Sequence, residues 1–228
     1  MAGPRFLFLS CLILFPLWSR AADDVMDQYL SVPGSYLFVR RTPEGATPNR
    51  VLMTVFEDFL CPACYRTATE IIPPLKTKYG DRLEIRFVGF PLIHPESRTA
   101  ARAYAIAQEM GLGKEMQEAL FKAHFQEDID TTSRAGLAKV ADSIGLAPEL
   151  LLSRLDSDGG NAEIEHNLAQ GNSYHLDAVP GIIFDGWIKV TELSEENLEK
   201  IIDGLLDKNK HLNEKATKTV HKGGGSTP

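Results

Sequence analysis

The chain has 228 residues, 43% of them hydrophobic, and a net charge of −7. This length and composition suit one globular domain carrying an insertion. The acidic balance, without a visible local basic patch, argues against binding to nucleic acid or to anionic membrane surfaces.

Residues 1–21 have the pattern of a targeting signal peptide rather than of a folded segment. Arg5 supplies a positive start, an apolar run covers Phe6 to Trp18, and Ser19-Arg20-Ala21 is a small-x-small cleavage site. The run is short for a membrane span, and an uncleaved anchor is the alternative interpretation.

Cleavage after Ala21 would remove Cys11, Arg5 and Arg20. It would leave Cys61 and Cys64 as the only cysteines, and 22 basic against 31 acidic residues, a net charge of −9. Export implies an oxidising location, periplasmic or otherwise extracytoplasmic, where disulfide chemistry has substrates.

The first elements after the signal peptide are a helix and two strands. Residues 22–34 are predicted to be an N-terminal helical segment that ends at Pro33-Gly34. Tyr36 to Arg40 is the first predicted strand. Val51 to Phe56, a nearly continuous apolar run, is predicted to be a buried central strand.

Cys61-Pro62-Ala63-Cys64 follows this second strand at the start of a predicted helix. A cysteine at a helix N-terminus faces unpaired N–H groups and the positive end of the helix dipole, which favour the thiolate. Pro62 suits the first helical position. We therefore expect Cys61 to be the attacking thiolate and Cys64, one turn further on, to be the resolving, more buried partner.

Two other interpretations of the Cys-x-x-Cys spacing are weaker. A zinc site usually needs four ligands, but the only other cysteine is Cys11 and the six histidines are scattered. An inert structural disulfide is the second alternative.

The helix after Cys61 is expected to reach Tyr79-Gly80, with an interruption at Pro73-Pro74. The strand alternation returns at Leu83 to Val88. This strand, helix, strand order predicts a βαβ unit with parallel strands.

Residues 96–176 are predicted to be an all-helical insertion, because several amphipathic segments follow one another there. None of these segments contains a recognisable functional motif. The predicted helices are Arg98–Met110, Lys114–Phe125, Ser133–Ile144, Pro148–Leu155 and Ala162–Gly171.

The strand pattern resumes at Val179 to Phe184 and continues at Trp187 to Val190. Asp185-Gly186 between these runs is a strong hairpin signal. A final amphipathic helix is expected after Ser194, and residues 208–228 are expected to be a disordered tail.

From Tyr36 to Asp207 this order resembles the DsbA-like branch of the thioredoxin superfamily. The resemblance depends on the Cys61–Cys64 motif, on Val179-Pro180 before the hairpin, and on the Phe90–Pro95 tract before an alanine-rich helix. It implies an α/β thioredoxin-like fold with a central mixed sheet, formed by residues 35–95 and 177–207 around the insertion.

The resemblance also implies a site. Cys61, Cys64 and Pro180 would be its catalytic residues, with a cis bond before Pro180, and Val179, Pro62 and Ala63 would contact substrate. No cofactor beyond the redox-active Cys61–Cys64 disulfide is needed. The expected partners are cysteine-containing protein substrates and a membrane protein that resets the redox state, and the protein itself is expected to be a monomer.

Several residues depart from the best-known members of this branch. Ala63 replaces a histidine that could stabilise the thiolate, and Val55 stands six residues before Cys61, where the family often has a buried acid. Glu57 and Asp58 are nearby acids that could relay protons, but we expect them to be solvated, as acids on loops usually are. His94 could border the site, but a loop histidine beside prolines is usually structural.

The most favoured function is therefore an exported thiol–disulfide oxidoreductase, acting as a dithiol oxidase. A disulfide reductase or isomerase would use the same residues with a different redox poise. A non-catalytic or chaperone-like binding module on the same fold is the alternative from another class, because a fold alone does not define a function.

Overall fold

The computed structural model describes residue 27 and residues 29–222, with the side chains described up to residue 210. The predicted signal peptide, residues 1–21, lies outside the described residues. Asp27 and Tyr29 have helical backbone, whereas the start of the predicted N-terminal helix is not described. Within the described part of the chain, no helix combines the length and apolar character needed to cross a membrane.

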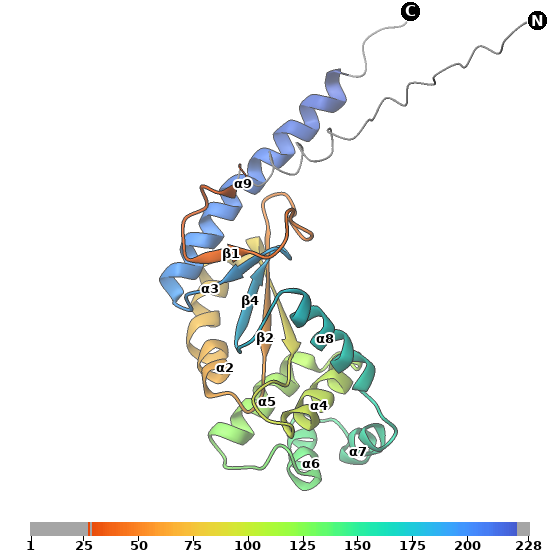
Figure 1. The fold of residues 1–228 in the computed structure, drawn as a ribbon. Helices are drawn as coiled ribbons and strands as arrows, with labels where there is room; N and C mark the ends of the chain where they lie inside the picture. The colour runs from red at the N-terminus through yellow and green to blue at the C-terminus, as the bar shows by residue number, and fades with distance from the viewer. Residues whose placement is uncertain (1–26, 28, 223–228) are drawn as a thin grey trace, which may run out of the picture.

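A five-stranded mixed sheet forms the centre of the molecule (Figure 1), with the strand order β1-β5-β4-β2-β3. The strands are β1 Tyr36–Phe38, β2 Val51–Glu57, β3 Leu83–Gly89, β4 Gly181–Phe184 and β5 Ile188–Val190. Strand β2 pairs in parallel with β3 and antiparallel with β4. The predicted βαβ unit and the burial of the second strand are confirmed.

The segment after Cys61 is helical but not one regular helix. It consists of α2 (Pro62–Arg66), a π-helical stretch η1 (Thr67–Ile71) and α3 (Ile72–Tyr79), followed by a short 3₁₀ turn η2 (Gly80–Arg82). The predicted interruption is confirmed, and it falls one turn before Pro73-Pro74. A proline lacks the N–H that would bond to the carbonyl four residues earlier, so the disturbance appears on its N-terminal side.

The insertion contains the helices α4 to α8, which gather at one end of the sheet (Figure 1). They are α4 Ser97–Glu109, α5 Gly113–Phe125, α6 Arg134–Ser143, α7 Pro148–Asp156 and α8 Asn161–Ser173. Their buried alanine and leucine side chains form one cluster that also contains Phe59, Cys61 and Cys64. The two cysteines therefore lie where the core of the insertion meets the end of β2.

Asp185 and Gly186 connect β4 to β5 with positive φ values of 47° and 73°. Two successive positive φ angles fit the tight hairpin that the sequence predicts. The last helix, α9 (Glu195–Lys222), starts after Ser194, whose hydroxyl accepts a hydrogen bond from the N–H of Asn197 at 3.2 Å.

The expected disordered tail is wrong for residues 208–222, because α9 continues to Lys222. Asn209 is fully buried; it accepts a hydrogen bond from the Tyr29 hydroxyl at 2.9 Å and donates one to the Arg50 carbonyl at 3.0 Å. The residues after it are mostly good helix formers, which extend the helix once its first half is anchored. Residues 223–228 lie outside the described part of the chain.

Candidate active site

Cys61 is the N-cap residue of α2, with extended backbone angles and Pro62 directly after it. Its sulfur accepts a hydrogen bond from the N–H of Cys64 at 3.3 Å. Hydrogen bonding with the Cys64 thiol lowers the pKa of Cys61 to about 6, and the N–H groups of Cys64 and Ala63 act in the same direction. Burial and the charge of Asp58 oppose this shift of the pKa. The arrangement favours a thiolate at Cys61.

Cys64 has the opposite character. Its side chain is 1% exposed, against 3% for Cys61, and its sulfur accepts a hydrogen bond from the N–H of Asp58 at 3.5 Å. Hydrogen bonding to the Cys61 sulfur and burial both raise the pKa of Cys64. The two cysteines are not joined by a disulfide in this structure. The opposite pKa shifts favour a thiolate at Cys61 that accepts a hydrogen bond from a protonated Cys64.

Val179 and Pro180 lie beside the cysteines although they are far away in the sequence. The bond between them is cis, as the resemblance implies. The Cys61 sulfur lies 3.6 Å from the Val179 carbonyl oxygen, within reach of a hydrogen bond when Cys61 is protonated. Val179 and Pro180 are half-buried, Ala63 is half-buried and Pro62 is exposed. All six predicted site residues thus lie at or beside the start of α2, and the roles assigned to them stay predictions.

The expectation that Glu57 and Asp58 are solvated is wrong, since each is only 1% exposed. Glu57 is the last residue of β2 and lies on the same face of that strand as Val55, because side chains alternate along a strand. Glu57 therefore places an acid on the same side of the sheet as Val55, the position where the family often has a buried acid. Burial raises the pKa of Glu57 to about 8, the amide of Gln117 opposes this, and the charge of Cys61 adds to it.

Asp58 holds the loop that follows β3. Its Oδ2 accepts hydrogen bonds from the N–H groups of Leu92 and Ile93, both at 2.8 Å, and its Oδ1 accepts one from Leu60 at 2.8 Å. Leu92 and Ile93 are 40% and 52% exposed. The buried carboxylate thus fixes a loop that presents two apolar side chains near the start of α2.

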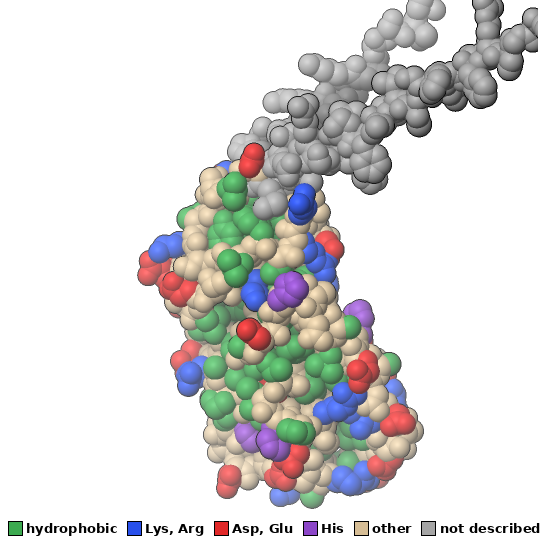
Figure 2. Space-filling view, viewed as in Figure 1, with side chains coloured by type: hydrophobic (Ala, Val, Ile, Leu, Met, Phe, Trp, Pro, Cys, Tyr) green, Lys and Arg blue, Asp and Glu red, His purple; other side chains and the backbone are tan. Residues whose placement is uncertain are grey.

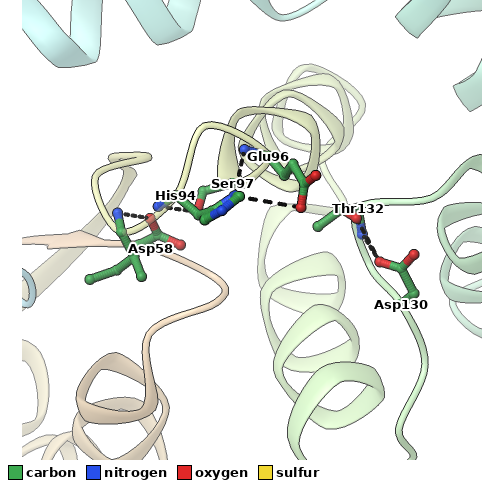
Figure 3. A network of polar contacts seen from close by, with 7 residues as sticks. Asp58, His94, Glu96, Ser97, Asp130 and Thr132 are labelled. Carbon is green, nitrogen blue, oxygen red and sulfur yellow. Dashed lines mark hydrogen bonds and ion pairs between the residues drawn. The ribbon is translucent and has the colours of Figure 1, made fainter.

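His94 belongs to the next part of this loop (Figure 3). Its N–H donates to the Ser97 hydroxyl at 3.3 Å, and its ring accepts a hydrogen bond from the N–H of Glu96 at 3.3 Å. These contacts order the start of α4. This placement agrees with a structural role for His94.

One residue at the site has no signal in the sequence. Gln117, in α5, is 5% exposed and its amide donates to Glu57 Oε1 at 2.6 Å. Gln117 lies on an amphipathic helix 60 positions after Glu57 and belongs to no recognisable motif, so the sequence does not predict this contact. Only the packing of the insertion against the end of β2 brings the two together.

The fold and this site together define a class: a thioredoxin-like protein with a Cys-x-x-Cys pair at a helix start and a cis-proline beside it. The model of the DSBA-like thioredoxin domain family matches residues 53–203, more than half of the chain. The chain belongs to this family, and the predicted family and fold are confirmed.

Solved structures of DsbA proteins share the fold at low sequence identity. DsbA from Xylella fastidiosa is 16% identical with a TM-score of 0.66, over 79% of this chain and 99% of that one. DsbA from Pseudomonas aeruginosa is 18% identical with a TM-score of 0.64, over 79% and 95%. Proteus mirabilis DsbA, solved in complex with a non-covalently bound peptide, is 19% identical to this chain with a TM-score of 0.55. The match covers 80% of this chain and 97% of that one. No curated protein sequence matches the chain significantly.

Proposed function

We propose that this chain is an exported thiol–disulfide oxidoreductase that oxidises pairs of cysteine thiols in protein substrates. The observation that carries the proposal is the position of Cys61 as the N-cap of α2, where its sulfur accepts a hydrogen bond from the Cys64 N–H, with Cys64 buried inside the first turn. A thiolate at Cys61, with a pKa of about 6, is a good leaving group, and this favours donation of the disulfide to a substrate.

The reaction starts from the Cys61–Cys64 disulfide. A substrate thiolate attacks the Cys61 sulfur, a bond forms between these two sulfurs, and the electron pair of the broken disulfide bond goes to Cys64. A second substrate thiolate then attacks the substrate sulfur of this mixed disulfide. Cys61 leaves as a thiolate, so the substrate loses two electrons and the Cys61–Cys64 pair gains them.

Cys64 needs a proton when its sulfur leaves, since its pKa is raised. Glu57 is a suitable donor. It is buried beside the cysteines and its pKa of about 8 keeps it protonated at neutral pH. Proton transfer leaves a Cys64 thiol and a Glu57 carboxylate, which must later recover a proton from water.

Substrate binding is proposed beside Val179 and Pro180. A cavity of about 310 Å³ begins there and is lined mainly by apolar side chains, among them Leu37, Leu176 and Leu193. Hydrophobic side chains gather on the middle of the face shown in Figure 2, over the part of the sheet that contains β4. An extended substrate segment would pair with the main chain of Val179 and place apolar residues in the cavity. A solved structure of Proteus mirabilis DsbA contains a non-covalently bound peptide, which supports peptide binding on this fold.

The proposed setting is the periplasm or another extracytoplasmic space, which the predicted signal peptide supports. In that setting a membrane protein would accept the two electrons from the reduced Cys61–Cys64 pair and restore the disulfide. No cofactor other than this disulfide takes part.

The reduction potential of the Cys61–Cys64 pair, measured against glutathione, tests the proposal. A dithiol oxidase should equilibrate within minutes at a potential above about −200 mV, and its disulfide form should oxidise a reduced peptide with two cysteines. A potential near about −270 mV, the range of thioredoxin, would indicate a reductase instead. A disulfide that neither glutathione nor dithiothreitol reduces would indicate the non-catalytic binding module.

A further inference from the structure

Besides the apolar packing between the helical insertion and the redox site, a short hydrogen bond from Gln117 to Glu57 connects the two. The Gln117 Nε2 lies 2.6 Å from Glu57 Oε1, and both side chains are almost completely buried. A hydrogen bond to one carboxyl oxygen fixes where the carboxyl group lies. It also favours the ionised form of Glu57, against the effect of burial.

Gln117 also lines a cavity of about 330 Å³ between the η1–α3 segment and α5. Tyr65, Ile72 and Phe121 contribute apolar walls, and Lys76, Lys114, Glu118 and Lys122 lie around it. Glu57 is not among the residues that line it. Gln117 therefore lies between Glu57 and a cavity that water can enter.

The groups that face Glu57 come from three helices and from its own strand end. Cys61 and Cys64 belong to the start of α2, Tyr104 to α4, and Gln117 to α5. Asp58 is its chain neighbour and bonds to backbone N–H groups instead. The charge of Glu57 raises the pKa values of both Cys64 and Tyr104. Of these groups, the amide of Gln117 is the one that favours the ionised form of Glu57 over the protonated form.

We propose that Gln117 is a positioning residue for proton transfer, which holds the Glu57 carboxyl group beside the cysteines and sets the pH range in which it gives its proton to Cys64. The inference rests on the proposed function. The proton passes from Glu57 to the Cys64 sulfur when the disulfide opens, and Glu57 recovers one from water that enters the cavity at Gln117. The insertion thereby contributes directly to the chemistry of the thioredoxin-like domain.

Two substitutions with opposite expected effects test this role. Gln117→Met keeps the length of the side chain but removes the donor, so the midpoint of Glu57 ionisation should rise by about one pH unit. Gln117→Lys places a cation beside the carboxyl group and should lower that midpoint by a similar amount. Gln126→Met is the matched control, because Gln126 lines the same cavity but donates to the Tyr65 hydroxyl.

The measurement is the infrared titration of the Glu57 carboxyl band in the disulfide form, in which neither thiol titrates, with Glu57→Gln used to assign the band. The pH dependence of the reaction of the disulfide with a dithiol peptide should move in the same directions. Circular dichroism checks the fold of each variant, and Gln117→Asn, which is too short to keep the contact, replaces Gln117→Met if that variant does not fold.

Opposite shifts in the two variants, with no shift in Gln126→Met, would support the inference. Equal shifts in the same direction, or no shift in either variant, would overturn it. A wild-type protein that exchanges no disulfides would contradict the proposed function alone, because the carboxyl band of Glu57 still reports whether Gln117 controls its ionisation.

Discussion

The two thiols of the site are one helical turn apart, yet their pKa values move in opposite directions. Cys61 is at the open end of α2, where backbone N–H groups point at its sulfur, and Cys64 is inside the turn. A pKa near 6 for Cys61, against a raised pKa for Cys64, makes one sulfur reactive at neutral pH and keeps the other protonated.

We expect iodoacetamide to alkylate Cys61 first in the reduced protein. The rate should rise from about pH 5 to pH 7, around the pKa of about 6, because only the thiolate reacts. Peptide mapping by mass spectrometry identifies the modified residue at each pH. Preferential alkylation of Cys64, or a rate that rises only above about pH 8, would contradict this assignment.

Ala63 is half-buried between the cysteines and contributes only its N–H to the Cys61 sulfur. Ala63→His should raise the reduction potential by about 30 mV or more, since a histidine adds positive charge and a donor that stabilise the thiolate. A shift of 30 mV corresponds to about 1.4 kcal/mol for this two-electron couple.

Equilibration of both proteins with glutathione measures this difference. Ala63→Ser serves as the control, because it adds a polar group without a positive charge. A potential that stays unchanged or falls in the histidine variant would show that other groups determine the redox poise.

At the scale of elements, Asp185 fastens the β4–β5 turn to its neighbours. Its carboxylate accepts a hydrogen bond from the N–H of Leu52 at 2.8 Å, and Asn209 of α9 lies 3.5 Å from it. The Asp185 carbonyl accepts bonds from the N–H groups of Glu44 and Gly45 at 2.9 and 3.1 Å. Burial raises the pKa of Asp185 to about 6, although these donors to its carboxylate oppose the shift.

This pKa shift predicts a pH dependence of stability. An acid with a higher pKa in the folded than in the unfolded state binds its proton more tightly when folded. The free energy of unfolding should therefore fall as the pH rises from about 4 to 6. The contribution is on the order of 3 kcal/mol, from a shift of about two pKa units.

Asp185→Asn should remove this contribution, because asparagine tolerates the positive φ of 47° and does not titrate. Urea unfolding of both proteins at pH 4 and pH 7 measures the difference. Asp128→Asn is the matched control, since Asp128 also has a positive φ, 53°, but is exposed. A slope of stability with pH that is the same in Asp185→Asn as in the wild type would exclude Asp185 as its source.

At the scale of the whole molecule, the predicted export determines whether disulfide chemistry has substrates at all. We expect the mature protein to begin at Ala22 when it is expressed with its full N-terminal segment in a bacterium, because Ser19-Arg20-Ala21 is a small-x-small site. Intact-mass spectrometry of the periplasmic fraction gives the answer. A product that keeps residues 1–21 in the cytoplasm would remove the argument for a dithiol oxidase.

The order and type of the elements follow from the sequence alone. Apolar runs, alternation, helical periodicity and turn residues act over a few positions, so they predict the βαβ unit, the insertion helices and the Asp185-Gly186 hairpin without any knowledge of packing. The same local reasoning places Cys61 at a helix start, where its acidity comes from its own N–H neighbours.

Only the tertiary structure decides what depends on contacts between distant segments. It buries Glu57 and Asp58, which the sequence alone predicts to be solvent-exposed acids of a loop. It also brings the Gln117 amide, from the helical insertion, to 2.6 Å from the Glu57 carboxyl group. It also extends α9 beyond Asp207, because Asn209 finds partners in Tyr29 and Arg50. Burial and hydrogen bonding across long sequence separations leave no periodic signal, so the pKa values that they set appear only when the chain is folded.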